Sequence, residues 1–416
     1  MHVITIIFLL ALFCSVFVQL WLIKRNISNI KAHRSQVPDE FIDKIELSEH
    51  QKAADYSIVK LKFSIIELLF GSLVLLAWTI GGGLQFLDQF ALQYQLSMPW
   101  NGVAVFLSLL LVMGIIDLPF GLYRTFKIEQ QFGFNKSTLS IFFVDLVKHT
   151  ALMVVLIIPL LALILWLMDT AGQYWWFYVW FVWMSFSLFM MWAYPAFIAP
   201  IFNKFKELND ELLKQTIDKL LQKCGFSNNG IFVMDGSRRS SHGNAYFTGM
   251  GSNKRIVFFD TLLESLDATE IEAVLAHELG HFKHKHIIKQ IIVMAIISLL
   301  ALALLGWLMQ FSPFFSALGV ESASTHMALI LFLLVSPIFS IYLQPIMSYF
   351  SRKHEFEADN YAAKQSDAKK LIQALVKLYK ENANTLTPDP LYSAFHDSHP
   401  PASVRIANLN QNSLGN

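Results

Sequence analysis

The stretch of sequence that decides the fold joins a polar segment directly to a long apolar run. Residues 269–311 read TEIEAVLAHELGHFKHKHIIKQIIVMAIISLLALALLGWLMQF. From residue 287 onward this run contains a single charged side chain, that of Lys289. A helix needs about 20 predominantly apolar residues to cross the hydrocarbon core of a bilayer. The stretch therefore predicts a polar helix that lies next to a membrane span.

The composition of the whole chain agrees with a membrane protein. Of its 416 residues, 55% are hydrophobic and only 15% are charged, and the mean hydropathy is +0.47. An average soluble domain has about 25% charged residues. These values exclude a disordered chain, a nucleic-acid-binding tail protein and an ordinary cytosolic enzyme, and they favour a polytopic protein of the lipid bilayer. The two cysteines, Cys14 and Cys224, lie far apart, which argues against a disulfide framework and against a cysteine-based zinc site.

Seven segments are apolar and long enough to span a membrane. They are residues 2–23, 63–86, 102–120, 149–168, 175–195, 287–311 and 327–350. The first segment has no positive region before it and no small-residue cleavage site, and Lys24 and Arg25 follow it directly. We therefore expect an uncleaved anchor and not a signal peptide.

The positive charges between the spans predict the orientation. Eight Lys and Arg residues lie between the first and second spans, four between the third and fourth, and eleven in residues 201–286. None lies between the second and third spans, the fourth and fifth, or the sixth and seventh. Because Lys and Arg concentrate in cytoplasmic loops, we expect the N-terminus outside, and the C-terminus and the large polar region in the cytoplasm.

This assignment divides the chain into four parts. Residues 1–200 carry the first five spans, 201–286 form a cytoplasmic segment, 287–350 carry the last two spans, and 351–416 form a second cytoplasmic segment. The predicted fold class is an α-helical polytopic membrane protein with a cytoplasmic α+β domain.

Helix and strand signals alternate within residues 201–286. A helical pattern over residues 207–224 ends at Gly225. Strands are predicted at residues 231–234, 244–248 and 255–260, with 249–253 as a hairpin connection. A capping box from Thr269 to Glu272 predicts the start of the next helix.

That next helix contains a metal-binding pattern. His277 and His281 are four residues apart, so on a helix both imidazoles can reach one metal ion, and Glu278 beside them can act on a water molecule. This HExxH pattern is typical of zinc proteases. No Pro or Gly occurs from residue 282 to 305, so we expect one helix to continue into the sixth span.

A catalytic zinc site needs a third protein ligand. The sixth and seventh spans form a hairpin, so residues 351–359 return to the same membrane face. Glu355 is the natural third ligand, with His354 and Glu357 as rivals, and Asp359 can hydrogen-bond a ligand imidazole and fix its tautomer. Without the upstream pattern, Glu355 and Asp359 would indicate only a solvated charged helix face.

Other ionisable residues lie at or inside the spans. His284 and His286 are interpreted as polar residues of the helix where it enters the lipid headgroups. Glu67, Asp117 and His149 would either line a water-filled chamber or lie at the membrane interface.

Several longer segments together resemble a known family. They are residues 128–136, 194–205, 240–247 and 253–263, the spacing from Glu355 to Asp359, and Ser398-His-Pro-Pro401 followed by Arg405. In these segments the chain resembles the type-1 CAAX prenyl proteases, which are integral membrane zinc endopeptidases. The matching segments run in order over nearly the whole chain.

The resemblance implies a fold and a set of roles. It implies seven transmembrane helices in a barrel around an intramembrane chamber, with a cytoplasmic zincin-like α+β metalloprotease domain. It implies one Zn²⁺ per chain, held by His277, His281 and Glu355, with Glu278 as the catalytic base.

Two further roles come from the resemblance alone. Asn244 would lie on the edge strand that binds the substrate backbone. His399 would stabilise the oxyanion of the transition state, with Arg405 nearby in support at the substrate site.

The chain also departs from the family's eukaryotic members. Only residues 264–276 lie between the Asp-Thr-Leu-Leu segment and HExxH, where those members carry a long insert, and residues 410–416 contain no ER-retrieval signal. We therefore expect a protein of a bacterial inner membrane, or of the ER membrane if the source is eukaryotic. We also expect a monomer, with a peptide or protein substrate whose prenylation is left open and with no nucleic-acid partner. The alternatives are a shorter HtpX-type quality-control protease and a seven-helix receptor or transporter with a structural metal site.

Overall fold

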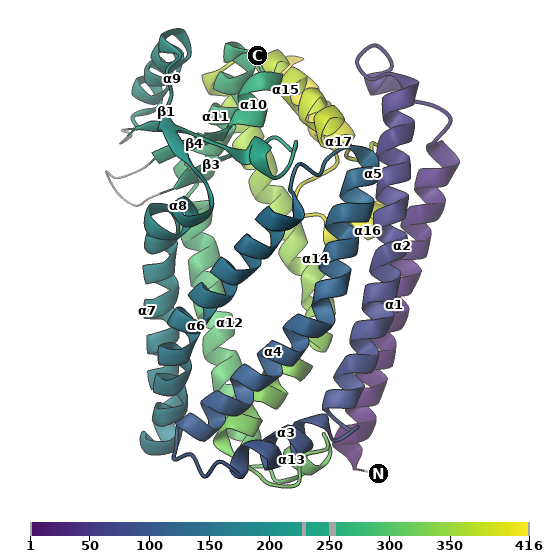
Figure 1. Ribbon diagram of the computed structural model, residues 1–416. Helices are drawn as coiled ribbons and strands as arrows, with labels where there is room; N and C mark the ends of the chain where they lie inside the picture. Colours follow the sequence, from purple (N-terminus) through teal and green to yellow (C-terminus); the bar gives the residue numbers. More distant parts are fainter. Residues whose placement is uncertain (1, 227–229, 249–254, 415–416) are drawn as a thin grey trace.

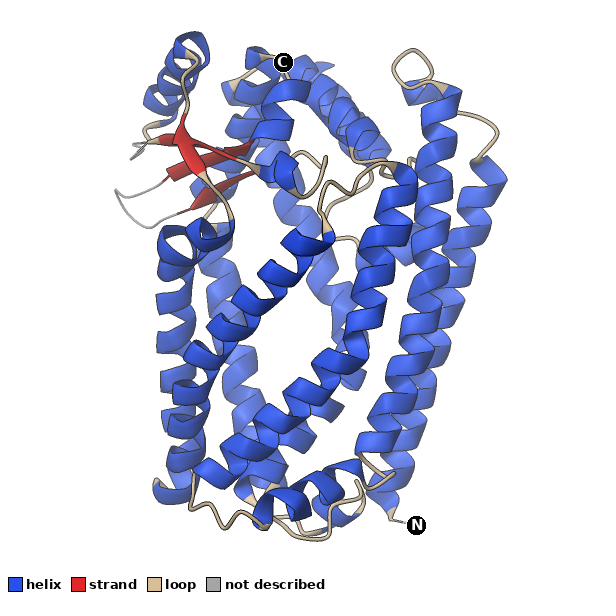
Figure 2. Ribbon diagram, viewed as in Figure 1, coloured by secondary structure: helices blue, strands red, loops and turns tan. Residues whose placement is uncertain are grey.

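A computed structural model describes residues 2–226, 230–248 and 255–414. The molecule is elongated and almost entirely helical, and its two termini lie at opposite ends (Figure 1). Figure 2 shows one small sheet, at the end of the molecule where the chain terminates. The hairpin connection expected at residues 249–253 lies outside the described residues.

The membrane helices agree with the predicted spans except at one place. Within the described ranges, six helical stretches are long and apolar enough to cross a membrane: Val3–His33, Trp100–Phe132, Leu139–Thr170, Gly172–Phe202, His286–Leu308 and Thr325–Gln365. A seventh crossing exists if α2 (Leu47–Trp78) and α3 (Gly83–Leu92), which meet at an angle of 49°, count as one span.

The break between α2 and α3 corrects the predicted continuous span over residues 63–86. The helix stops at Trp78, and Gly81, Gly82 and Gly83 follow shortly after it. Gly82 has a φ of 78°, a left-handed conformation that glycine adopts without steric cost. Three adjacent glycines also give the segment a low helix propensity, so the chain turns here.

The remaining elements connect these helices or build the polar end. The helices are α1 (Val3–His33), α4 (Trp100–Tyr123), α5 (Gln130–Phe132), α6 (Leu139–Thr170), α7 (Trp175–Ala193), α8 (Ala199–Phe202), α9 (Glu211–Cys224), α10 (Asp260–Ser265), α11 (Ala268–Lys283), α12 (His286–Leu308), α13 (Pro313–Ser316), α14 (Thr325–Gln365), α15 (Ala368–Glu381), α16 (Pro390–His396) and α17 (Ala402–Leu414). Two π-helical segments, η2 (Arg124–Glu129) and η4 (Tyr194–Ile198), follow α4 and α7, and short 3₁₀ turns are η1 (Asp39–Phe41), η3 (Gly172–Tyr174) and η5 (Gly236–Arg238).

The sheet has four strands in the order β1-β2-β4-β3. They are β1 (Phe205–Glu207), β2 (Ile231–Met234), β3 (Ala245–Thr248) and β4 (Arg255–Phe259). β2 and β4 are parallel, and the other two pairs are antiparallel. The predicted strand at 231–234 is confirmed, and the other two are confirmed to within one residue. β3 is an edge strand.

Two predicted helix starts are wrong. The helix expected from residue 207 begins at Glu211, with Asp210 as its N-cap, because Glu207 pairs with Phe232 in the sheet. The helix with the HExxH pattern begins at Ala268. Its capping box is Asp267 with Glu270, and not the predicted pair Thr269 with Glu272.

The predicted continuous helix from the HExxH pattern into the sixth span is also wrong. α11 ends at Lys283 and α12 begins at His286, and Lys285 between them has a φ of 56°. Such a conformation is costly for a residue with a side chain, so tertiary contacts must hold it. The contacts are those of His286, which is 2% exposed and stacks on the ring of His354.

Two hydrophobic cores lie at opposite ends of the molecule. One packs the sheet against α9, α10, α11, α15, α17 and the last turns of α14, around Phe258, Leu275 and Leu371. The other packs α1, α3, α4, α6, α7, α12, α13 and the first turns of α14, around Leu165 and Met327. α14 belongs to both cores and therefore links the two ends.

Candidate metal centre

Close contact between α11 and α14 builds the centre. A Cβ atom placed on Gly280 would lie 2.8 Å from the Cα atom of Ala358, so only glycine fits there without a shift. This approach brings the histidine face of α11 against Glu355 and Asp359, which lie one turn apart on α14 and are both buried. The glycine inside the HExxH pattern thus has a packing role.

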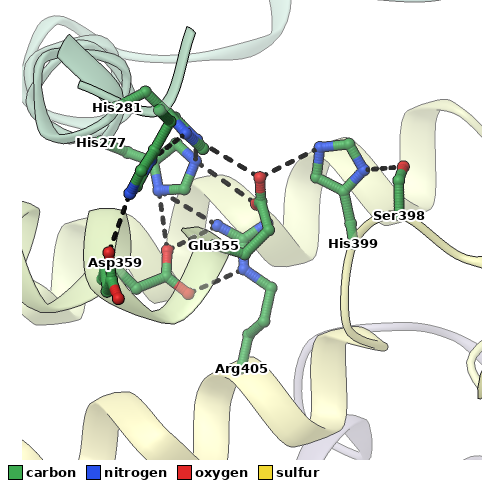
Figure 3. A network of polar contacts seen from close by, with 9 residues as sticks. His277, His281, Glu355, Asp359, Ser398, His399 and Arg405 are labelled. Carbon is green, nitrogen blue, oxygen red and sulfur yellow. Dashed lines mark hydrogen bonds and ion pairs between the residues drawn. The ribbon is translucent and has the colours of Figure 1, made fainter. Parts of the chain in front are cut away.

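The side chains of His277, His281 and Glu355 converge on one point (Figure 3). One ligand atom from each lies within 4.8 Å of the others. The two imidazole Nε2 atoms are 3.2 Å apart. Glu355 places Oε1 3.3 Å from Nε2 of His281 and Oε2 3.5 Å from Nε2 of His277.

This donor set fits a zinc ion. Two nitrogen ligands at the usual distance of about 2.0–2.1 Å in a tetrahedral site lie about 3.3 Å from each other. The buried Oε2 atom of Glu355 accepts no hydrogen bond from the described residues, and its contact with the guanidinium group of Arg405 is an ion pair at 3.4 Å. A metal ion between the three donors would satisfy this oxygen atom.

The rival ligands lie elsewhere. The ring of His354 stacks on that of His286 at 4.0 Å, and the carboxylate of Glu357 lies 2.9 Å from Nε2 of His286. Neither side chain belongs to the convergent group of His277, His281 and Glu355 within the described residues.

Asp359 and Arg405 hold the outer side of His277. Oδ1 of Asp359 lies 2.9 Å from Nδ1 of His277. Arg405 donates from Nε to Oδ2 of Asp359 at 2.8 Å and from Nη2 to Oδ1 at 2.5 Å, and its Nη1 lies 3.4 Å from Oε2 of Glu355. Arg405 is 6% exposed, and its Nη2 also lies 3.3 Å from Nδ1 of His277.

The charge balance around His277 favours a cation at the centre. Burial disfavours the charged imidazole, but contacts with Asp359 and Glu355 outweigh burial and raise the pKa of His277 to about 9. Both carboxylates therefore stabilise a positive charge on this ring, Asp359 at Nδ1 and Glu355 at Nε2. A divalent metal ion bound at Nε2 would supply such a charge.

A second chain of contacts holds His281 and was missed in the sequence. Nδ1 of His281 lies 2.9 Å from Nδ1 of His286, and Nε2 of His286 lies 2.9 Å from Oε2 of Glu357. His286 is therefore a buried residue between a candidate ligand and a carboxylate, at the first residue of α12. His284 stacks on His286 at a centroid distance of 5.6 Å. The only signal in the sequence was the presence of His286 five residues after His281. On a continuous helix this spacing would not bring the two rings together, and it does so here because the helix breaks at Lys285.

The carboxylate of Glu278 is not engaged by other described side chains. It lies next to His277 on α11 and is partly exposed, and it makes no hydrogen bond or ion pair with the described residues. An unpaired carboxylate beside the three donors can accept and return a proton.

His399 approaches the centre from the C-terminal segment. Its Nε2 lies 3.4 Å from Oε1 of Glu355, and its side chain is 64% exposed (Figure 3). Arg352, one turn before Glu355 on α14, donates to the carbonyl oxygens of Ser393, Ala394 and Asp397 at 3.0–3.3 Å. One arginine thus ties the loop before His399 to the helix that carries Glu355, a role without any signal in the sequence.

Asn244 lies immediately before β3. Its side-chain Oδ1 accepts from the backbone N–H of Ala245 at 2.8 Å, and its carbonyl accepts from Phe259 of β4 at 3.0 Å. The residue is exposed at the edge of the sheet.

The three ionisable residues singled out at or inside the spans do not belong to the convergent group of His277, His281 and Glu355. Glu67 forms an ion pair with Arg124 across α2 and η2. Asp117 lines a cavity between α2 and α4, and the ring of His149 stacks on Phe202 at 4.2 Å.

Comparisons with known proteins cover both the membrane helices and the centre. A model of the CAAX prenyl protease N-terminal region, with five membrane helices, matches residues 26–204, and a model of peptidase family M48 matches residues 207–413. The CAAX prenyl protease 1 homolog of Arabidopsis thaliana is 42% identical over 70% of this chain and 69% of its own. CAAX prenyl protease 1 of Saccharomyces cerevisiae is 33% identical over 91% of this chain and 89% of its own. A crystal structure of S. mikatae Ste24p has a TM-score of 0.91 and 31% identity, and the match covers 98% of this chain and 99% of that one.

Proposed function

Because the chain belongs to the CAAX prenyl protease 1 family of M48 peptidases and is thus a multi-pass membrane metalloendopeptidase, we propose that it cleaves prenylated CAAX-type or other membrane-associated proteins near their C-terminus. The observation that carries the proposal is the convergence of His277, His281 and Glu355, with Glu278 unpaired beside them.

The metal of this centre is one Zn²⁺ per chain in our proposal. The supporting observations are the two imidazoles and one carboxylate, which are the donors of hydrolytic zinc sites. When bound, zinc would act as a Lewis acid toward the scissile carbonyl and would lower the pKa of a water molecule. His277 and His281 would bind through Nε2, with their Nδ1 atoms held by Asp359 and His286.

Glu278 would carry the proton. Its carboxylate would take a proton from the attacking water as the water oxygen forms a bond to the scissile carbonyl carbon. It would then give this proton to the leaving nitrogen as the C–N bond breaks.

Two further residues would act on the substrate. A peptide would add as a strand to the free edge of β3 beside Asn244, where no strand of the described sheet pairs. His399, which is exposed beside Glu355, would donate to the developing oxyanion. Arg405 would act through Asp359 and Glu355 as a positioning residue, because it is buried behind them.

The membrane arrangement belongs to the same proposal. The spans would enclose a chamber, with the N-terminus outside and the centre in the cytoplasm, as the alternation of positive loops indicates. The zincin-like unit would assemble from residues 201–286 and 351–416, with residues 1–200 and 287–350 in the membrane. The short segment over residues 264–276 favours a bacterial inner membrane, and the protein would act as a monomer.

A single assay tests the function. Purified protein would be incubated with a farnesylated CAAX peptide and with its unprenylated counterpart, with and without a zinc chelator. We expect cleavage that the chelator abolishes and that added zinc restores. Glu278→Ala should bind zinc but lose nearly all activity. Full activity in this variant would overturn the mechanism, and stoichiometric zinc without any chelator-sensitive cleavage would indicate a structural metal site.

A further inference from the structure

A cavity of about 520 Å³ adjoins the candidate centre on the side of His399. One wall is formed by residues of α2 and η2, and another by α16 and the segment from Asp397 to Pro401. Its volume lies in the range of about 300–1,000 Å³ that is typical of pockets for small ligands. A short peptide fragment that extends beyond His399 would enter it.

The charged groups of the α2 and η2 wall are not all paired. Glu67 and Arg124 neutralise each other in an ion pair. Lys60 also lines the cavity and is exposed there, but no carboxylate of the described residues lies within ion-pair distance of its Nζ. Its contacts are with Tyr56, whose hydroxyl lies 3.4 Å from Nζ and whose ring centroid lies 4.6 Å away. Lys60 thus makes no ion pair with the described residues. Burial lowers the pKa of its ammonium group, and Glu129 acts on it only from beyond ion-pair distance.

The opposite wall carries an acidic group that does not compensate Lys60. Asp397 lies beside His396 and His399, and burial raises the pKa of its carboxyl. The cavity is therefore polarised, with a carboxyl group next to His399 and, on α2, an ammonium group that makes no ion pair with the described residues.

Lys60 is connected to the start of the edge strand. The Tyr56 hydroxyl donates to Oε1 of Glu129 at 2.6 Å, and Oε2 of Glu129 lies 3.5 Å from Nε2 of His242, two residues before Asn244. The sequence segments 128–136 and 240–247 meet here, since Asn135 and Ser240 form a β-bridge. A substrate strand antiparallel to β3 would direct its C-terminal end toward Asn244, and so toward this wall.

We propose that Lys60 binds the C-terminal carboxylate of the peptide substrate inside this cavity, so that the site recognises a free chain end. The proposal rests on the peptidase function proposed above. An ammonium group without an ion-pair partner, in a peptide-sized cavity beside the catalytic centre, is complementary to a carboxylate.

Paired substrates test this role directly. Two farnesylated peptides of the same sequence would be compared, one with a free C-terminal carboxylate and one with a C-terminal amide. kcat/KM would be measured for the wild type, Lys60→Gln, Lys60→Arg and the matched control Lys62→Gln. Lys62 lies on the same helix, but it does not line the cavity.

We expect the wild type to prefer the free acid by about 10–100-fold, the range of one hydrogen-bonded charge pair. Lys60→Gln should remove this preference by slowing cleavage of the acid only, whereas Lys60→Arg and Lys62→Gln should keep it. A preference that survives Lys60→Gln, or an equal loss for both peptides, would overturn the proposal.

A binding measurement distinguishes failure of the carboxylate site from failure of the proposed peptidase function. The affinities of both peptides for the wild type and for Lys60→Gln would be measured by fluorescence anisotropy with the zinc chelated. Tighter binding of the acid that depends on Lys60 supports the carboxylate site, even if no peptide is cleaved and the proposed function fails. Equal binding of acid and amide by the wild type would reject the site.

Discussion

The two ends of α14 each carry a buried contact between a histidine and a carboxylate, and they differ in what surrounds it. Near the first turn, Nε2 of His326 lies 2.8 Å from Oδ1 of Asp88. Near the other end, His277 contacts both Glu355 and Asp359. All five side chains are buried.

Only one of these two ends gathers further donors. At the Asp88 end, the described residues provide no third ligand, and Nδ1 of His326 and Oδ1 of the nearby Asn101 are buried without partners. At the Glu355 end, a second histidine joins, and the outer atoms of both imidazoles are held. A buried histidine–carboxylate pair is therefore not a site in itself. The candidate centre differs because three donors converge there. In addition, the Nδ1 atoms of its two imidazoles are held by Asp359 and His286.

The largest expected difference between the two ends appears when one carboxylate is removed from each. Glu355→Ala should lose zinc and all detectable peptidase activity, because two imidazoles alone bind zinc weakly. Asp88→Asn should keep both. Elemental analysis of the purified variants measures the zinc content. Stoichiometric zinc in Glu355→Ala would assign the third ligand to another residue.

The next largest effect is expected from replacing the tightly packed glycine at each end of α14 with alanine. A Cβ atom on Gly280 would lie 2.8 Å from Cα of Ala358, and one on Gly102 would lie 2.7 Å from Cβ of His326. Gly280→Ala should push α11 from α14 and lower kcat/KM by about 10²-fold, since catalytic groups tolerate little displacement.

Gly102→Ala serves as the matched control for that substitution. It should lower the melting temperature in detergent and leave the kcat/KM of the folded fraction unchanged. Equal activity losses in both variants would mean that the two ends are not independent.

The support of His281 can be tested separately from the ligands. His286→Phe keeps a ring in the stack with His354 but removes both hydrogen-bonding nitrogens. We expect zinc affinity to fall by about 10–100-fold, the usual effect of losing such a supporting partner. Glu357→Gln should give a smaller loss in the same direction, as measured by competition with a chelator. Unchanged affinity in both variants would show that His281 needs no such support.

The smallest effect is expected at the Asp88 end itself. Asp88→Asn should reduce the free energy of unfolding by about 1–3 kcal/mol, because a charge-assisted hydrogen bond in a buried place is weakened. Thermal unfolding in detergent, followed with and without zinc, measures this change. A loss of the zinc-dependent stabilisation in this variant would contradict a purely structural role.

The parts of the site that could be predicted from the sequence depend on local spacing. The i, i+4 relation of His277 and His281, and the one-turn relation of Glu355 and Asp359, hold on any regular helix. The apolar spans follow from length and hydropathy in the same way. The strand at 231–234 and the helix end at Gly225 follow from local conformational preference.

The parts that could not be predicted depend on contacts between distant segments. The left-handed conformation of Lys285 follows from the burial of His286 against His354, which no local pattern reveals. Arg352 acquires its role only because α16 returns to α14. In the sequence, Lys60 is one of eight positive residues between the first two spans. Only the structure shows that it lines the same cavity as His399.

α14 connects the apolar core at one end of the molecule to Glu355 at the other. A straight helix from Thr325 to Glu355 would rise about 45 Å at about 1.5 Å per residue. One degree of tilt would then move Glu355 by about 0.8 Å, and Pro337 and Pro345 inside α14 are the places where the helix can bend. Spanning helices tilt in response to hydrophobic mismatch with the lipid. We therefore expect the turnover rate of this enzyme to vary with acyl-chain length in reconstituted vesicles.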